Sequence, residues 1–120
     1  EKPDDYVIAS GNHKSVREFI NKCLECLDID VEWIGHGKDE LAINKKNNKK
    51  IIQVSEIYFR PTEVNALLGD ATKAKNKLGW KPKITFDEMV KEMIEHDFEI
   101  AKKEKIIVDH GYNIQKKIDE

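Results

Sequence analysis

The sequence has little arginine, no excess of positive charge and no long apolar run. The last two shortages each argue against a class of protein. Arginine occurs only at positions 17 and 60 among 21 basic residues, and the net charge is −2. Non-specific binding to nucleic acid needs a basic excess or stripe, so we expect no nucleic-acid partner. No apolar run approaches the ~18 residues of a membrane span, and no signal peptide is evident. We therefore expect no membrane partner and a cytoplasmic location.

Cysteine is also scarce, with Cys23 and Cys26 in a C-x-x-C pattern. A redox motif of this kind sits at the start of a helix after a strand, whereas this pair falls inside a helical pattern. No second cysteine pair or nearby histidine completes a zinc site, so we predict no metal. We expect two buried free thiols, which suits a reducing compartment.

The chain has 120 residues, enough for one small domain with a modest core. Apolar spacing and capping signals predict helices over 16–27, 71–78 and 86 to about 104. Apolar runs between turn residues predict short strands over 6–9, 31–34 and 51–54, and a fourth over 64–68. The polar stretch 38–50 predicts a mobile loop. The expected fold class is α+β, with three main helices and three or four short strands.

The scarce arginine directs attention to Arg60, which is followed by Pro61 and Glu63. A guanidinium fork holds phosphate or carboxylate through paired hydrogen bonds, which the point charge of lysine cannot do. An ionised Glu63 only accepts hydrogen bonds, so it suits two neighbouring sugar hydroxyls. Together they could bind a nucleotide, but from spacing alone a surface ion pair at a turn explains them as well. Arg17 points away from the apolar stripe of its helix, which favours a structural role at the surface.

Several segments, taken together, resemble the C-terminal part of the GDP-mannose 4,6-dehydratases, a branch of the extended short-chain dehydrogenase/reductases. The Leu-Gly-Trp-Lys-Pro run over 78–82 is shared across those reductases, whereas Arg-Pro-Thr-Glu-Val over 60–64 is similar to the GDP-mannose branch. The resemblance covers about residues 4–112 and rests on segments 6–11, 13, 15–19, 58–64, 68–75 and 78–82.

The resemblance implies a small substrate-binding lobe over 1–105 and a C-terminal tail over 106–120, with the N-terminal Rossmann lobe absent. Arg60 matches the family position that contacts the nucleotide diphosphate, and Glu63 the position that binds the guanosine ribose. The intact enzyme would use NADP to convert GDP-mannose to GDP-4-dehydro-6-deoxy-mannose plus water, and would be a homo-oligomer. No Gly-rich phosphate loop occurs in this sequence, and the family's catalytic residues lie upstream of the match. We therefore expect no catalytic residue here and no activity from this chain alone.

One pattern matches the spacing of a catalytic pair in the reductases: Tyr112 and Lys116 form a Tyr-x-x-x-Lys sequence. It follows Gly111 near the end of the chain, with no cofactor lobe, so we interpret it as coincidence.

Three functions stay open on the sequence. The first is a fragment of a dehydratase, and the second is a stand-alone module that binds a nucleotide sugar without catalysis. The third is an interaction domain in which Arg60 and Glu63 are a surface pair. The first predicts an exposed apolar face and marginal stability when the chain is alone.

Overall fold

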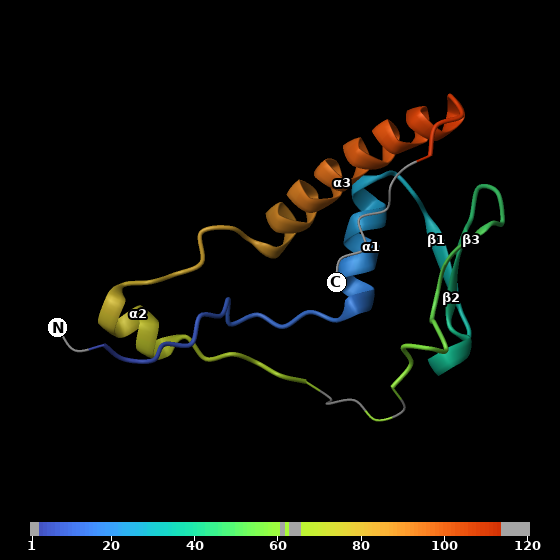
Figure 1. Ribbon diagram of the computed structural model, residues 1–120. Helices are drawn as coiled ribbons and strands as arrows, with labels where there is room; N and C mark the ends of the chain where they lie inside the picture. Colours follow the sequence, from blue (N-terminus) through green and yellow to red (C-terminus); the bar gives the residue numbers. More distant parts are fainter. Residues whose placement is uncertain (1–2, 61, 63–65, 114–120) are drawn as a thin grey trace.

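The computed structural model describes residues 3–60, 62 and 66–113, and within them it is a mixed α+β structure (Figure 1). Three helices and a three-stranded sheet confirm the predicted fold class. In chain order the elements are α1 (Val16–Cys26), β1 (Val31–Ile34), the short 3-10 turn η1 (Gly37–Asp39), β2 (Leu41–Asn44), β3 (Lys50–Gln53), α2 (Thr72–Leu78) and α3 (Phe86–Asp109).

Local capping explains where the two longer helices begin. The hydroxyl of Ser15 accepts the backbone N–H of Glu18 at 3.1 Å, and the Glu18 carboxylate accepts the N–H of Ser15 at 2.8 Å. Thr85 and Glu88 form the same capping box at the start of α3. Both boxes were predicted and are confirmed.

The end of α3 was predicted too early. The helix continues past residue 104 to Asp109, where we expected a frayed tail from 106. Nothing in this stretch breaks a helix before Gly111, whose φ of +80° is the left-handed conformation that ends helices. An i,i+4 ion pair between Lys105 and Asp109 supports this last turn. The division of the chain at residue 105 stays a prediction.

The sheet corrects the prediction for residues 38–50. Instead of a mobile excursion, this stretch supplies β2, the central strand, which pairs antiparallel with β1 on one side and β3 on the other. Ala42 is completely buried, and the turn between β2 and β3 is closed by Asn48 in a left-handed conformation. A short apolar core inside a polar stretch is sufficient for a strand when both of its edges are paired.

Two predicted strands are absent from the described part of the chain. Residues 6–9 and 66–68 have no regular secondary structure, and 64–65 lie outside the described residues. The segment before residue 6 is held by α2, because the ammonium of Lys73 donates to the Asp4 carboxylate at 2.8 Å and to the Asp5 carbonyl at 2.9 Å. Without a neighbouring strand to supply a ladder of hydrogen bonds, an apolar run stays irregular.

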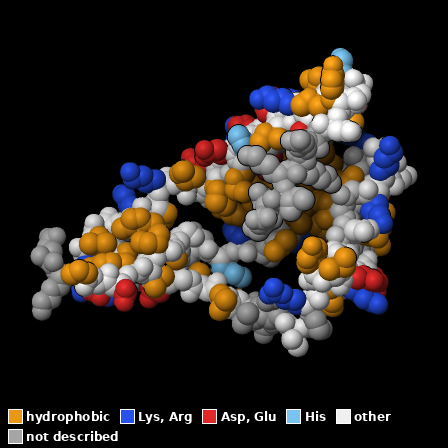
Figure 2. Space-filling model, viewed as in Figure 1, with side chains coloured by type: hydrophobic (Ala, Val, Ile, Leu, Met, Phe, Trp, Pro, Cys, Tyr) orange, Lys and Arg blue, Asp and Glu red, His pale blue; other side chains and the backbone are white. Residues whose placement is uncertain are grey.

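The core is small and the molecule is open. Among the described residues, the buried apolar side chains are Leu24, Ala42, Ala74 and Val90. α1 packs against α3, with the rings of Phe19 and Phe86 edge to face at 6.4 Å. In Figure 1, α2 stands apart, joined to the rest by extended segments, and Figure 2 shows a hollow between the two parts.

Two global dimensions agree with this picture. The radius of gyration is 19.2 Å, against roughly 14 Å for a compact chain of this length. The accessible surface is 10986 Å², against roughly 6,700 Å² for a folded monomer of 13.9 kDa. Many large apolar side chains are exposed, so the predicted apolar surface is present.

The two cysteines are free thiols, as predicted, but they are not equally buried. Cys23 is half-buried, and burial raises the pKa of its thiol. Cys26, the last residue of α1, is exposed. The expectation of two buried thiols is therefore wrong for Cys26.

Candidate functional site

Arg60 lies at the end of an arm, residues 54–60, that leaves the sheet after β3. The arm starts at a fixed point, because the backbone N–H of Val54 donates to the carbonyl of Glu40 at 3.0 Å. It then turns, with the N–H of Tyr58 donating to the Ser55 carbonyl at 3.2 Å. Arg60 itself is exposed, so its guanidinium is accessible to a ligand from solvent.

The arm returns to the sheet through Phe59. The Phe59 ring faces η1, because a Cβ built on Gly37 would lie 4.0 Å from the Cζ atom of the ring. Phe59 is 39% exposed, whereas the neighbouring Tyr58 is 82% exposed. Phe59 is therefore the less exposed of the two aromatic residues, with the tip of its ring beside Gly37.

The turn that receives Phe59 is sterically constrained. Gly35 has a φ of +81°, and a Cβ on it would lie 2.4 Å from the carbonyl oxygen of Asp39. No L side chain fits such an approach to backbone, so glycine is required there. The Gly35-His36-Gly37 sequence marks this closed turn.

The turn is also tied to α1. The guanidinium of Arg17 forms an ion pair with the carboxylate of Glu40 and lies 5.1 Å from the ring centroid of Trp33. Glu40 is largely buried, at 18% exposure of its side chain. The predicted structural role of Arg17 is thus supported: it joins α1 to the sheet next to the arm.

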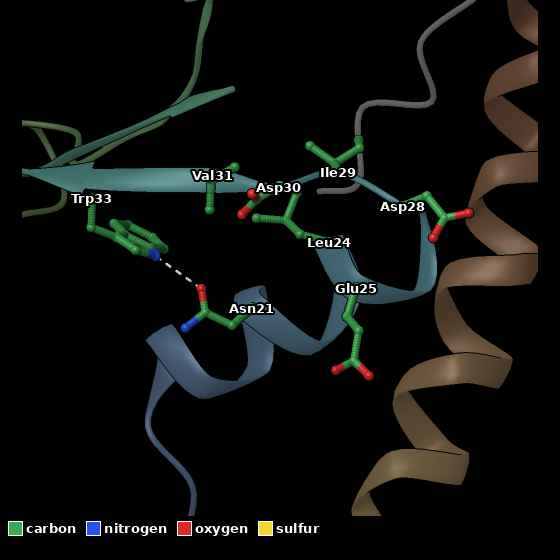
Figure 3. A pocket seen from close by; sticks show the side chains of 8 residues that line it. All are labelled: Asn21, Leu24, Glu25, Asp28, Ile29, Asp30, Val31 and Trp33. Carbon is green, nitrogen blue, oxygen red and sulfur yellow. Dashed lines mark hydrogen bonds between the residues drawn. The ribbon is translucent and has the colours of Figure 1, made fainter. Parts of the chain in front are cut away.

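The side chains of Trp33 and Asn21 border a hollow of about 510 Å³ between α1 and β1 (Figure 3). The indole N–H of Trp33 donates to the amide oxygen of Asn21 at 2.8 Å, and the two side chains point toward each other in Figure 3. Glu25, Asp28 and Asp30 also line the hollow, but Glu25 is paired with Lys22 and Asp30 with Lys45, and in Figure 3 the Glu25 carboxylate points away from Trp33 and Asn21. Arg60 does not line this hollow, so the hollow is separate from the residue predicted to hold the diphosphate.

Two other expectations about site residues fall partly outside the described residues. Glu63 is among the residues that the structure does not describe, so the pairing of Arg60 with Glu63 stays a prediction. Tyr112 follows the end of α3 and is 70% exposed, whereas Lys116 lies outside the described part. The interpretation of this Tyr-x-x-x-Lys spacing as coincidence therefore stays a prediction.

The described part of the chain, residues 3–60, 62 and 66–113, contains no group of three or more potential metal ligands. It also contains no helix that is both long and apolar enough to cross a membrane; α3 has the length, but charged residues recur along it.

Comparison with known proteins gives a family match and several similar sequences. Residues 1–93 match the family described as GDP-mannose 4,6 dehydratase. The chain is 41% identical to a GDP-mannose 4,6-dehydratase of Vibrio cholerae over 99% of its own length and 35% of that protein. It is 45% identical to GDP-mannose 4,6 dehydratase 1 of Arabidopsis thaliana, over 93% of this chain and 26% of the relative. It is 43% identical to the GDP-mannose 4,6 dehydratase of Homo sapiens, over 85% of this chain and 27% of the relative. The chain thus spans from about a quarter to about a third of these relatives.

Proposed function

This chain belongs to the family of GDP-mannose 4,6-dehydratases, and from that membership we propose that it is the part of such an enzyme that binds the nucleotide sugar. The observation that carries the proposal is that the family match includes Arg60, whose side chain is exposed at the end of an anchored arm. Its guanidinium would hold the diphosphate of GDP-mannose, and Glu63 would accept hydrogen bonds from the ribose hydroxyls.

The complete enzyme would be a lyase that forms GDP-4-dehydro-6-deoxy-mannose plus water, in the cytoplasm, on the way to GDP-fucose. NADP is the cofactor that we propose for it. The residues of this chain do not fit that cofactor, because the sequence contains no Gly-rich loop that could receive a pyrophosphate. Both the cofactor and the catalytic groups would therefore be held by other parts of the enzyme, and this chain alone would be inactive.

Exposed apolar side chains support a partner that covers them. Val7, Ile8, Leu67 and Leu68 are 56–76% exposed, and they flank the contact of Gly69 with Ala9. An apolar surface of this kind usually marks an interface. We propose that the N-terminal cofactor lobe of the same polypeptide covers it, and that the complete enzyme is a homo-oligomer.

The first measurement is the intact mass of the protein as cells make it. A mass near three to four times 13.9 kDa, in line with the 26–35% coverage of the relatives, supports a dehydratase with its cofactor lobe. A mass equal to that of this chain favours a stand-alone module and contradicts the proposed enzyme.

Titration calorimetry with GDP then tests the site in the complete polypeptide. Replacement of Arg60 by Ala should weaken GDP binding by about 10- to 100-fold, because a charge-assisted hydrogen-bonded pair is lost. Lys38→Ala is the matched control, since Lys38 is an exposed cation on the neighbouring η1 turn and should leave the affinity within about twofold. An unchanged affinity in Arg60→Ala would refute the nucleotide site and favour a purely structural surface pair.

A further inference from the structure

The arm that carries Arg60 is fixed to the same short turn at two points. Its first residue, Val54, donates its N–H to the carbonyl of Glu40 at 3.0 Å, directly after η1. Its sixth residue, Phe59, lies against Gly37, the first residue of η1. Arg60 follows immediately after the second attachment. The backbone of residues 54–59, which leads to Arg60, therefore contacts both ends of the η1 region: Val54 contacts Glu40, and Phe59 contacts Gly37.

That turn is itself unable to shift freely. Its entry is closed by Gly35, whose Cα approaches the carbonyl of Asp39 too closely for any side chain. Its exit residue, Glu40, is held by the ion pair with Arg17 of α1 and is largely buried. A turn constrained in these two ways gives the arm a rigid support.

We propose that Phe59, seated on the η1 turn, is a positioning residue that sets where Arg60 presents its guanidinium to the diphosphate of the nucleotide sugar. This inference rests on the proposed function, because it takes Arg60 as the phosphate-binding group. The arginine side chain has many rotatable bonds, and binding is weaker when its backbone must first be ordered. Phe59 removes that cost before the ligand arrives, without touching the ligand.

The two neighbouring aromatic residues distinguish this role from a general contribution of aromatic surface. Tyr58 is at 82% exposure and Phe59 at 39%, although they are adjacent in the chain. The tip of the Phe59 ring lies beside Gly37 of the η1 turn. The Tyr58→Ala variant is therefore a matched control that removes an aromatic ring of the same size from the same arm.

The test is a double-mutant cycle in the complete polypeptide, with the dissociation constant of GDP measured by calorimetry. Phe59→Ala should weaken GDP binding about 3- to 10-fold, the cost of ordering one or two more side chains on binding. In an Arg60→Ala background the same change should alter the affinity by less than about twofold, because there is no guanidinium left to position. For the dehydratase reaction, Phe59→Ala should raise KM for GDP-mannose and leave kcat nearly unchanged.

The variants are chosen so that the two proposals fail separately. An unchanged affinity in Arg60→Ala overturns the nucleotide site and this inference with it. A normal loss in Arg60→Ala together with an unchanged affinity in Phe59→Ala overturns only the positioning role. Equal losses from Phe59→Ala with and without Arg60, or an equal loss in Tyr58→Ala, also overturn it. Should Phe59→Ala fail to fold, Phe59→Leu decides: the contact with Gly37 is made by the Cζ atom of the ring, which leucine does not reach. A folded Phe59→Leu protein should therefore bind GDP about 3-fold more weakly, and an unchanged affinity overturns the positioning role.

Discussion

Replacement of Arg17 by Ala should destabilise the protein much more than the loss of an ordinary surface cation does. Arg17 forms an ion pair with Glu40 and lies 5.1 Å from the centroid of the Trp33 ring. The Oε1 atom of Glu40 is buried, and the guanidinium of Arg17 compensates its charge. The variant leaves a buried carboxylate oxygen without that compensation.

The expected magnitude combines two terms. A buried acceptor left unsatisfied costs about 1–3 kcal/mol, and an exposed cation–π contact contributes about 0.5–1 kcal/mol. The Arg17 side chain is 52% exposed, so water screens its charge and the lower half of the first range applies. We expect a loss of about 2 kcal/mol in the free energy of unfolding.

Equilibrium urea denaturation of the complete polypeptide measures this loss, with two further variants to assign it. Glu40→Gln in the Arg17→Ala background should recover about half of the loss, because a neutral amide is cheaper to bury than a carboxylate. Arg17→Met retains contact with Trp33 and should fall between the unmodified protein and Arg17→Ala. A loss below about 0.5 kcal/mol, or effects at positions 17 and 40 that simply add, would refute the coupling.

Four further outcomes are expected. With a thiol reagent at pH 8, exposed Cys26 should react faster than half-buried Cys23, whose pKa is raised by burial, and Cys26→Ser should retain only the slow phase. The backbone N–H of Thr85, and after it the Thr85 hydroxyl, donate to Glu88 and lower the pKa of its carboxyl from the ordinary 4.5. This stabilisation is complete above pH 4.5 and lost as the pH falls through the lowered value, so Glu88→Gln should reduce the acid sensitivity of unfolding. Gly35→Ala should lower the melting temperature and GDP affinity together, because its Cβ would collide with backbone. Expressed alone, residues 1–120 should bind a hydrophobic dye and unfold without a sharp transition; a cooperative, high-melting monomer would contradict the interface that we propose.

The sequence predicted best what is determined by neighbours along the chain. Ser15 and Thr85 begin helices because each meets a glutamate three residues later, and both partners are visible in the sequence. Gly79 ends α2 in a left-handed conformation for an equally local reason. Asp70 was a candidate cap for α2, but the N-cap is Ala71; the Asp70 carboxylate instead accepts the N–H of Thr72, the first residue of the helix.

What the sequence could not predict depends on contacts between distant segments. β2 is only four residues long and is surrounded by lysine and asparagine, so its strand character follows from pairing on both edges rather than from composition. The partners of Arg17 lie on β1 and beside β2, and no spacing rule connects them. The attachment of Phe59 to Gly37 is of the same kind. The residue types of the candidate site were visible in the sequence, but the support that holds Arg60 was not.

The failed strand prediction at residues 6–9 carries information about the larger enzyme. Tyr-Val-Ile-Ala is apolar on both of its alternating faces, the pattern of a strand buried on both sides. In the described structure this segment is irregular and Val7 and Ile8 are more than half exposed, so the local sequence and the observed conformation disagree. In natural proteins the conformation that a local sequence favours usually agrees with the conformation it has in the fold. The disagreement is what we expect of a segment whose hydrogen-bonding and packing partners belong to the cofactor lobe of the proposed dehydratase. The exposed Leu67 and Leu68 beside it support the same interpretation, because one added lobe would cover both segments.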